Sequence, residues 1–120
     1  MNKIVWGFSG EEAKMEDVLA HIPKGWHALA EELIKDLFEL GWDGTLLQTK
    51  EKFGGFRFYI NKGNRAIFDR IAEAGDKSFT ICEVTGKPGK RRTDLTWIRT
   101  LCDEEYDKLR HKHSEEIEDE

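Results

Sequence analysis

A chain of 120 residues is long enough to bury one hydrophobic core but too short for two domains of ordinary size. Its two cysteines do not supply a disulfide framework, the residues before Trp6 do not resemble a secretory signal, and no apolar run approaches the roughly 20 residues that cross a bilayer. We therefore expect a single cytoplasmic domain without a membrane role.

The formal charge of −5 is distributed unevenly along the chain. Residues 1–44 carry 4 basic and 9 acidic side chains, residues 45–102 carry 12 and 6, and residues 103–120 carry 3 and 9. A basic middle segment can concentrate an anionic ligand, although the acidic total disfavours general nucleic-acid binding. The same pattern also arises when acidic and basic segments simply face one another in the fold.

The first part of the chain is expected to form a short edge strand and a short helix. Residues 3–8 are largely apolar and suit an edge strand. Ser9 and Glu12 have the spacing of a capping box, which predicts a helix over about residues 10–21. A proline and a glycine then interrupt the chain.

A clearer amphipathic helix is predicted to follow and to end at Gly41. Its apolar residues recur at steps of three and four: Trp26, Leu29, Ala30, Leu33, Ile34, Leu37 and Phe38. Charged residues occupy the opposite side, as expected for a solvated face. Trp26 and Trp42 lie at either end of this helix, and we expect both to anchor the core.

Residues 45–61 are predicted to form a β-hairpin that turns at Gly54-Gly55, because glycines readily adopt the positive φ angles of tight turns. Pairing Phe53 with Phe56 sorts the side chains into two faces. The mostly apolar face holds Leu47, Thr49, Glu51, Phe53, Phe56, Phe58 and Ile60; the polar face holds Gln48, Lys50, Lys52, Arg57, Tyr59 and Asn61. In this register Lys52 lies opposite Arg57, an arrangement that weakens a sheet unless an anion or a carboxylate lies between them.

The second half of the chain is predicted to contain a helix, a two-stranded segment and a final helix. The first helix runs from Asn64, a good N-cap, to about Lys77, and buries Ile67, Phe68, Ile71, Ala72 and Phe79. A strand over 79–84 is expected to enter a turn at 85–89 and to be followed by a returning strand over 95–101. The last helix begins near Asp103.

These elements predict an α+β fold, in which a small antiparallel sheet built on the central hairpin of about residues 45–61 packs against two to four helices. One domain would span residues 1–110. Residues 111–120 are acidic and nearly devoid of apolar side chains, which predicts a disordered tail.

The sequence contains no recognisable catalytic motif. It lacks a phosphate-binding loop, a dinucleotide fingerprint, a serine-hydrolase elbow and a metalloprotease motif. A catalytic cysteine would need a neighbouring histidine, but no motif links Cys82 to any of the four: His21, His27, His111 and His113. We therefore expect a binding protein without a cofactor, not an enzyme.

Anion binding is the chemistry that the residues favour most. Lys50, Lys52, Arg57 and Tyr59 would project together from the polar face of the hairpin. Arg91 and Arg92 follow a glycine-containing loop whose amides can also meet phosphate oxygens. Arginine forks suit phosphates and a tyrosine ring suits a base, so we predict a nucleotide-like ligand. The alternative is an ordinary solvated surface with salt bridges to the acidic helices.

Four segments carry a resemblance to a family of small, largely uncharacterised phage and prophage proteins. They are Gly25-Trp26 with Leu29, then QTKEKFGGFRFY at 48–59, CEVTGKPG at 82–89 and WIRTLCD at 97–103. Their order and spacing extend over about two-thirds of the chain. The resemblance implies a shared fold and a viral origin, but it implies no established activity.

The resemblance also implies a metal site from which this chain departs. Relatives commonly show a C-x-x-C-G knuckle and a later cysteine, sometimes followed by histidine, which resembles a zinc ribbon. Here the second position of the knuckle is Thr85, and Glu105 occupies the position of the histidine.

A structural zinc ion needs about four nitrogen or thiolate donors, so Cys82 and Cys102 cannot close a site by themselves. Two alternatives remain open. His111 and His113 could complete a site from the terminal segment. Otherwise the two cysteines are buried free thiols, and packing replaces the metal; this second alternative is the one that we predict.

These observations lead to one main hypothesis and two alternatives. The main hypothesis is a non-catalytic phage protein that counters host defence in the host cytoplasm by sequestering an anionic, nucleotide-like signalling molecule, as a small homo-oligomer. The first alternative is an inhibitor that binds a host defence protein through its acidic helices and tail. The second is a degenerate zinc-ribbon module that binds nucleic acid through Arg91, Arg92 and Trp97.

Overall fold

The structure, a computed structural model, describes residues 2–118, and the side chains of residues 2–110. In chain order its elements are β1 (Ile4–Trp6), β2 (Glu12–Ala13), α1 (Met15–Leu19), the single 3-10 turn η1 (Lys24–Trp26), α2 (His27–Glu39), β3 (Thr45–Lys52), β4 (Gly55–Ile60), α3 (Arg65–Ser78), β5 (Lys90–Arg92), β6 (Arg99–Leu101) and α4 (Asp103–Glu118). The predicted α+β fold is confirmed. No helix in the described part of the chain is both long and apolar enough to cross a membrane.

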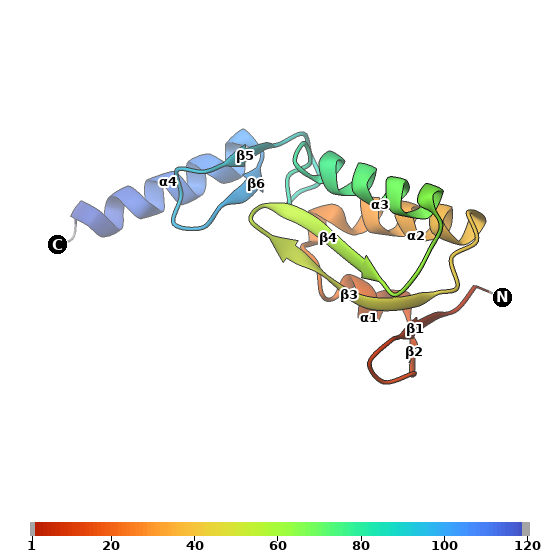
Figure 1. Cartoon of the computed structure of the whole chain (residues 1–120). Coiled ribbons are helices and arrows are strands. Elements are labelled where there is room, and N and C mark those ends of the chain that lie inside the picture. Colours follow the sequence, from red (N-terminus) through yellow and green to blue (C-terminus); the bar gives the residue numbers. More distant parts are fainter. Residues whose placement is uncertain (1, 119–120) are drawn as a thin grey trace.

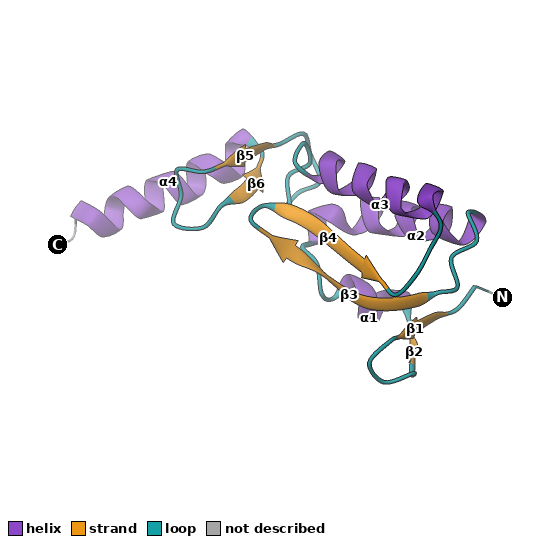
Figure 2. Ribbon diagram, in the orientation of Figure 1, coloured by secondary structure: helices purple, strands orange, loops and turns teal. Residues whose placement is uncertain are grey.

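The main sheet has four strands in the order β2-β1-β3-β4, and a separate ribbon pairs β5 with β6. Helices α2 and α3 run side by side over the β3–β4 hairpin, while the ribbon and α4 extend from the hairpin tip (Figures 1 and 2). The sheet is mixed, because β1 joins β3 in parallel through Val5–Thr45 and Trp6–Leu46. The prediction of a purely antiparallel sheet was therefore wrong in this one pairing.

The core lies between α2, α3 and the sheet. Helix α2 buries the apolar positions that its periodicity predicts: Leu29, Ala30, Leu33, Ile34 and Leu37. Trp26 and Trp42 are buried as predicted. The Trp26 indole Nε1 donates a hydrogen bond of 2.9 Å to the Ile81 carbonyl, so this anchor also joins the helical layer to the segment that follows α3.

The hairpin turns one residue earlier than predicted. Lys52 pairs with Gly55, which leaves Phe53 and Gly54 as a two-residue turn with φ angles of 53° and 80°. Pairing Phe53 with Phe56 was therefore wrong, and the true register differs by two residues. Because side chains alternate with a period of two, this shift leaves the predicted polar face unchanged. It moves Lys50, in place of Lys52, opposite Arg57.

A β-bulge between Leu46 and Gln48 accounts for a second difference in the hairpin. The extra residue rotates the strand, so Leu46 is fully buried and Leu47 is 43% exposed. The prediction that Leu47 faces the core was therefore wrong.

Two predicted elements near the N-terminus also differ from the structure. The predicted edge strand is β1, which is not at an edge, because it lies between β2 and β3. The segment 10–21 contains β2 and the short α1 in place of one helix. The capping contact is made by Asp17, whose carboxylate accepts from the Lys14 N–H at 3.0 Å, and Ser9 Oγ instead accepts from the Glu11 N–H. In β2 an exposed Glu12 is followed by Ala13, which is buried in the sheet. This strand alternation thus outweighs the capping spacing of Ser9 and Glu12.

The second half of the chain combines confirmed and corrected elements. Helix α3 begins as predicted, with the Asn64 side chain accepting from the Ile67 N–H at 2.9 Å. Phe68, at 47% exposure, and Ala72 are exposed, although both were predicted to be buried. The predicted strand over 79–84 is replaced by turns, and β5 and β6 form the two-stranded segment. Helix α4 begins at Asp103 as predicted and its backbone continues to Glu118. The side chains of the predicted tail, residues 111–120, lie outside the described residues, so its disorder stays a prediction.

Phe53 is strained at its position in the turn, because its φ angle is positive. A residue with a β-carbon at positive φ is strained by about 1–2 kcal/mol, whereas asparagine tolerates this conformation. We predict that Phe53→Asn raises the free energy of unfolding by about 1 kcal/mol, measured by urea denaturation. Phe53→Ala is the matched control, because it removes the ring but keeps the strained β-carbon; an equal gain from both variants would contradict the role of strain.

Candidate functional site

The outward face of the β3–β4 hairpin brings together most of the predicted site residues. Lys50 lies directly opposite Arg57, and Gln48 lies directly opposite Tyr59. Side chains opposite each other in an antiparallel pair have β-carbons about 5 Å apart. Lys50 and Arg57 are half-buried and Lys52, one pleat closer to the turn, is exposed. We call Lys50, Lys52 and Arg57 the cationic face.

No carboxylate neutralises the cationic face within the part of the chain that the structure describes. None of the ion pairs found there includes Lys50, Lys52 or Arg57. Lys52 Nζ lies 5.6 Å from the centre of the Phe53 ring. Arg57 Nε is buried without a hydrogen-bond partner in this part of the chain. Two like charges thus face each other without a carboxylate between them, an arrangement that weakens the sheet and that a bound anion would stabilise.

A groove adjoins the cationic face at the end of the hairpin away from the turn. Its volume is about 720 Å³. The residues that line it are Trp6, Phe8, His21, Leu47, Gln48, Thr49, Lys50, Tyr59 and Ile60. We call this hollow the aromatic groove. The Phe8 ring is 78% exposed and the Tyr59 ring 42%, so both present faces for stacking.

The aromatic side of the groove comes from residues that the sequence analysis did not select. The Trp6 ring lies 5.7 Å from that of Phe8 and meets the His21 ring edge-on at 5.4 Å, measured between ring centres. These residues reach the hairpin only because β1 joins β3 in parallel, a pairing between distant segments that no local pattern reveals. One indication of this groove was present in the sequence: two aromatic residues, Trp6 and Phe8, at the end of a short predicted strand.

The other two predicted site residues lie at the ribbon. Arg91 Nε donates to the Phe53 carbonyl at 3.0 Å, and its guanidinium stacks 5.3 Å from the Phe79 ring. Arg92 binds the Leu101 carbonyl and pairs with Asp103 at 2.7 Å. Neither arginine lines the aromatic groove. Both hold the ribbon in place, and their part in ligand binding stays a prediction.

The segment that resembles a zinc knuckle is organised around two buried free cysteines, Cys82 and Cys102. The Thr85 hydroxyl donates to Cys102 Sγ at 3.8 Å, so the residue at the second knuckle position stabilises a sulfur atom. Two sulfurs and a hydroxyl do not fit the donor set of structural zinc. The described side chains contain no group of three metal-binding residues, and the side chains of His111 and His113 lie outside them.

The electrostatics of Cys82 are unusual for a buried thiol. Burial raises its pKa, but hydrogen bonds from the Thr85 side chain and from the main chain of Cys102, Thr85 and Val84 outweigh burial and lower the pKa to about 7. Hydrogen bonds of this kind stabilise the thiolate. The turn around Cys82 thus stabilises a negative charge on its sulfur atom.

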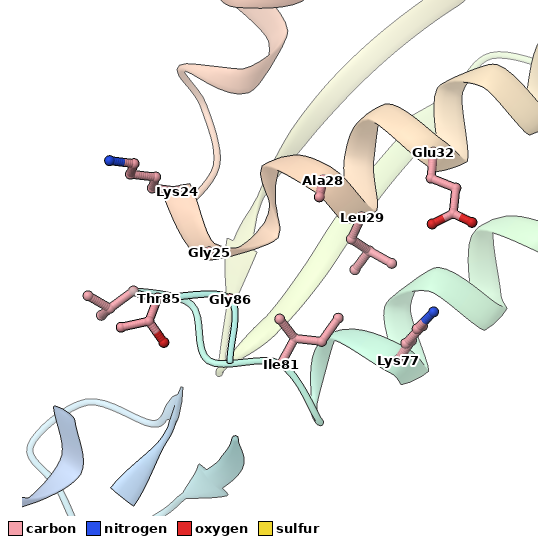
Figure 3. Close-up of a pocket in the computed structure, with 10 residues that line it drawn as sticks. Lys24, Gly25, Ala28, Leu29, Glu32, Lys77, Ile81, Thr85 and Gly86 are labelled. Carbon is pink, nitrogen blue, oxygen red and sulfur yellow. The ribbon is translucent and has the colours of Figure 1, made fainter. Parts of the chain in front are cut away.

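A smaller hollow of about 450 Å³ lies where α2 begins, beside the knuckle (Figure 3). Leu29 and Ile81 form its apolar side, while Lys24 and Lys77 extend from separate elements. No aromatic ring lines it. It therefore combines charge with an apolar surface but lacks the stacking platforms of the aromatic groove.

The comparisons with protein-family models, with curated proteins and with solved structures found no match for this chain. We therefore infer function from the geometry of the site.

The lowered pKa of Cys82 predicts how stability depends on pH. Because the thiol titrates near 7 when folded and near 9.0 in its ordinary state, its stabilising contribution is full above pH 9 and is lost as the pH falls through 7. We expect the free energy of unfolding to rise between pH 7 and 9, and to rise less in Cys82→Ala and Thr85→Val. Urea denaturation at several pH values measures this, and equal slopes in all three proteins would contradict the assignment.

Proposed function

We propose that this protein binds an anionic, nucleotide-like molecule without transforming it. The observation that carries the proposal is the Lys50–Arg57 pair, two facing cations without a carboxylate partner among the described residues. Lys50 lines the aromatic groove, and Arg57 lies opposite it on β4, outside the lining. Charge and stacking surface are the two properties that a nucleotide requires of its site. The volume of 720 Å³ lies in the range of about 300–1,000 Å³ that is usual for small-molecule sites.

Each part of the site has a separate task in this proposal. Lys50 and Arg57 bind the phosphate through their charged groups. Tyr59 and Phe8 stack on the base, since both rings are exposed at the groove. Gln48 lies opposite Tyr59 and offers both a donor and an acceptor to the edge of the base.

The biological role that we propose is capture of a signalling molecule in the cytoplasm of a host cell, by a small homo-oligomer. The support comes from the resemblance of residues 25–103 to phage and prophage proteins, together with a sequence that carries no catalytic motif. A protein that lowers the free concentration of a signal by mass action needs affinity and abundance, not turnover. The role would therefore be counter-defence by sequestration.

Reversal of the central charges tests the site. We predict that a Lys50→Glu, Arg57→Glu double variant binds a fluorescent ATP analogue at least 10-fold more weakly than the wild type, because each charge-assisted hydrogen bond contributes about 1.5–3 kcal/mol. Fluorescence anisotropy at low salt measures the dissociation constants. Lys35→Glu on the exposed side of α2 is the control for charge reversal away from the groove; it changes the net charge by half as much as the double variant.

Binding assays, a deletion and a mass spectrum separate this proposal from its alternatives. No binding of the analogue at millimolar concentration, or equal binding by the double variant and the Lys35 control, overturns it. Deletion of residues 111–120 is expected to leave binding unchanged, whereas an inhibitor that acts through its acidic tail would lose its activity. A native mass spectrum of protein purified from defence-active cells would then identify the natural ligand by its mass.

A further inference from the structure

A separate hollow of about 410 Å³ lies where the tip of the β3–β4 hairpin meets the ribbon (Figure 1). The residues that line it are Glu51, Phe53, Glu83, Trp97, Ile98 and Arg99. None of these residues lines the aromatic groove. The volume lies in the range of about 300–1,000 Å³ that is usual for small-molecule sites. We call this space the tip hollow.

Two large aromatic side chains are exposed at the tip hollow. Trp97 is 76% exposed and Phe53 is 57% exposed. Neither ring packs against another aromatic ring in the described part of the chain. A ligand that stacks on Trp97 therefore covers apolar surface that is otherwise in water, without breaking a contact inside the protein.

Hydrogen bonds between the hairpin tip and the ribbon hold the walls of the tip hollow in place. The Phe53 carbonyl accepts from Arg91 Nε at 3.0 Å, and the Gly54 carbonyl accepts from Thr100 Oγ1 at 2.6 Å. The main-chain N–H of Thr100 donates to Glu83 Oε1 at 3.1 Å. The hollow is therefore formed before a ligand arrives, which lowers the entropic cost of binding.

The polar side chains of the tip hollow have acceptors and donors to spare. Glu51 Oε2 accepts from the Gly54 N–H at 2.7 Å, and Glu83 Oε1 accepts from Arg99 Nε at 3.2 Å. The second oxygen of each carboxylate and the terminal nitrogens of Arg99 make no hydrogen bond among the described side chains. None of these atoms is buried, because Arg57 Nε is the one buried side-chain atom without a partner there. They are therefore available to a ligand.

The charges around the tip hollow are of both signs and favour a neutral ligand. Burial raises the pKa of Glu83, the Arg99 guanidinium opposes this effect, and the Glu51 carboxylate adds to it. An anion would therefore meet two carboxylates that already repel each other. A cation would meet the Arg99 guanidinium at the hollow and Lys52 beside the Phe53 ring. Hydroxyl groups, which both donate and accept hydrogen bonds, match this mixture.

We propose that the tip hollow binds a neutral sugar of the β-glucose type, a function beyond the proposed capture of a nucleotide. A pyranose ring with equatorial hydroxyl groups has C–H groups on its flat faces, and one such face stacks on Trp97. Its hydroxyls donate to the second oxygens of Glu51 and Glu83 and accept from the terminal nitrogens of Arg99. One ligand thus uses both the aromatic surface and the spare polar groups.

NMR titration with cellotriose, a chain of β-linked glucose units, tests this proposal. We expect millimolar cellotriose to shift the resonances of the Trp97 indole N–H and of the Arg99 amide, and the shifts to saturate. Two control compounds are expected to leave both resonances unchanged at the same concentration. Sorbitol has the hydroxyl groups but no flat C–H face, and acetyl-arginine amide carries a cation instead.

Variants of Trp97 and Glu51 connect the sugar to the tip hollow. Trp97→Ala is expected to weaken cellotriose binding at least 5-fold, followed at the Arg99 amide, because it removes the stacking surface. Phe68→Ala removes another exposed aromatic ring, on α3, and is expected to leave binding unchanged. Glu51→Gln keeps an oxygen for the Gly54 N–H but loses the charge, so we expect cellotriose to bind at least 3-fold more weakly.

The results that would overturn the proposal are distinct from those of the nucleotide assay. No saturable shift at tens of millimolar cellotriose, or equal binding by the wild type and Trp97→Ala, overturns it. A larger shift with acetyl-arginine amide than with cellotriose also overturns it and assigns the hollow to a basic segment of a partner protein. The Lys50→Glu, Arg57→Glu double variant is expected to bind cellotriose as the wild type does, because neither residue lines the tip hollow.

Discussion

The close contact between the start of α2 and the knuckle is the constraint on which the arrangement of this protein depends. The Gly25 N–H donates to the Glu83 carbonyl at 2.7 Å, and a β-carbon on Gly25 would lie 2.0 Å from the Cys82 carbonyl. Only glycine permits this approach. The neighbouring Trp26 is buried, bonds to Ile81 and packs 6.3 Å from the Phe56 ring. Two adjacent residues therefore join helix, knuckle and hairpin, and so place the ribbon at the hairpin tip.

Sequence reasoning succeeded where one local pattern decides the structure. Helix α2 follows from apolar spacing, and α3 begins at Asn64 because a side-chain cap is a contact over three residues. The cationic face followed from the period of a strand alone, since Lys50 and Arg57 fall on one face in either register. An error of two residues in the register therefore did not alter the predicted site residues.

The features that escaped prediction depend on contacts between distant segments. The aromatic side of the groove needs the parallel pairing of β1 with β3, and the bulge that exposes Leu47 arises at the end of that pairing. The early turn places a phenylalanine at positive φ, against the preference that favoured Gly54-Gly55. Gly55 is instead needed in the strand, because the Phe79 ring lies 2.7 Å from where its β-carbon would be. Tertiary packing thus prevailed over local preference.

The facing pair of Lys50 and Arg57 has a consequence for how this protein can evolve. Their mutual repulsion makes the empty protein less stable than it would be with a carboxylate at either position. A substitution of this kind would place an internal counterion where the proposed anion is to bind. If the proposed site binds an anion, selection for stability and selection for affinity act in opposite directions at these two positions.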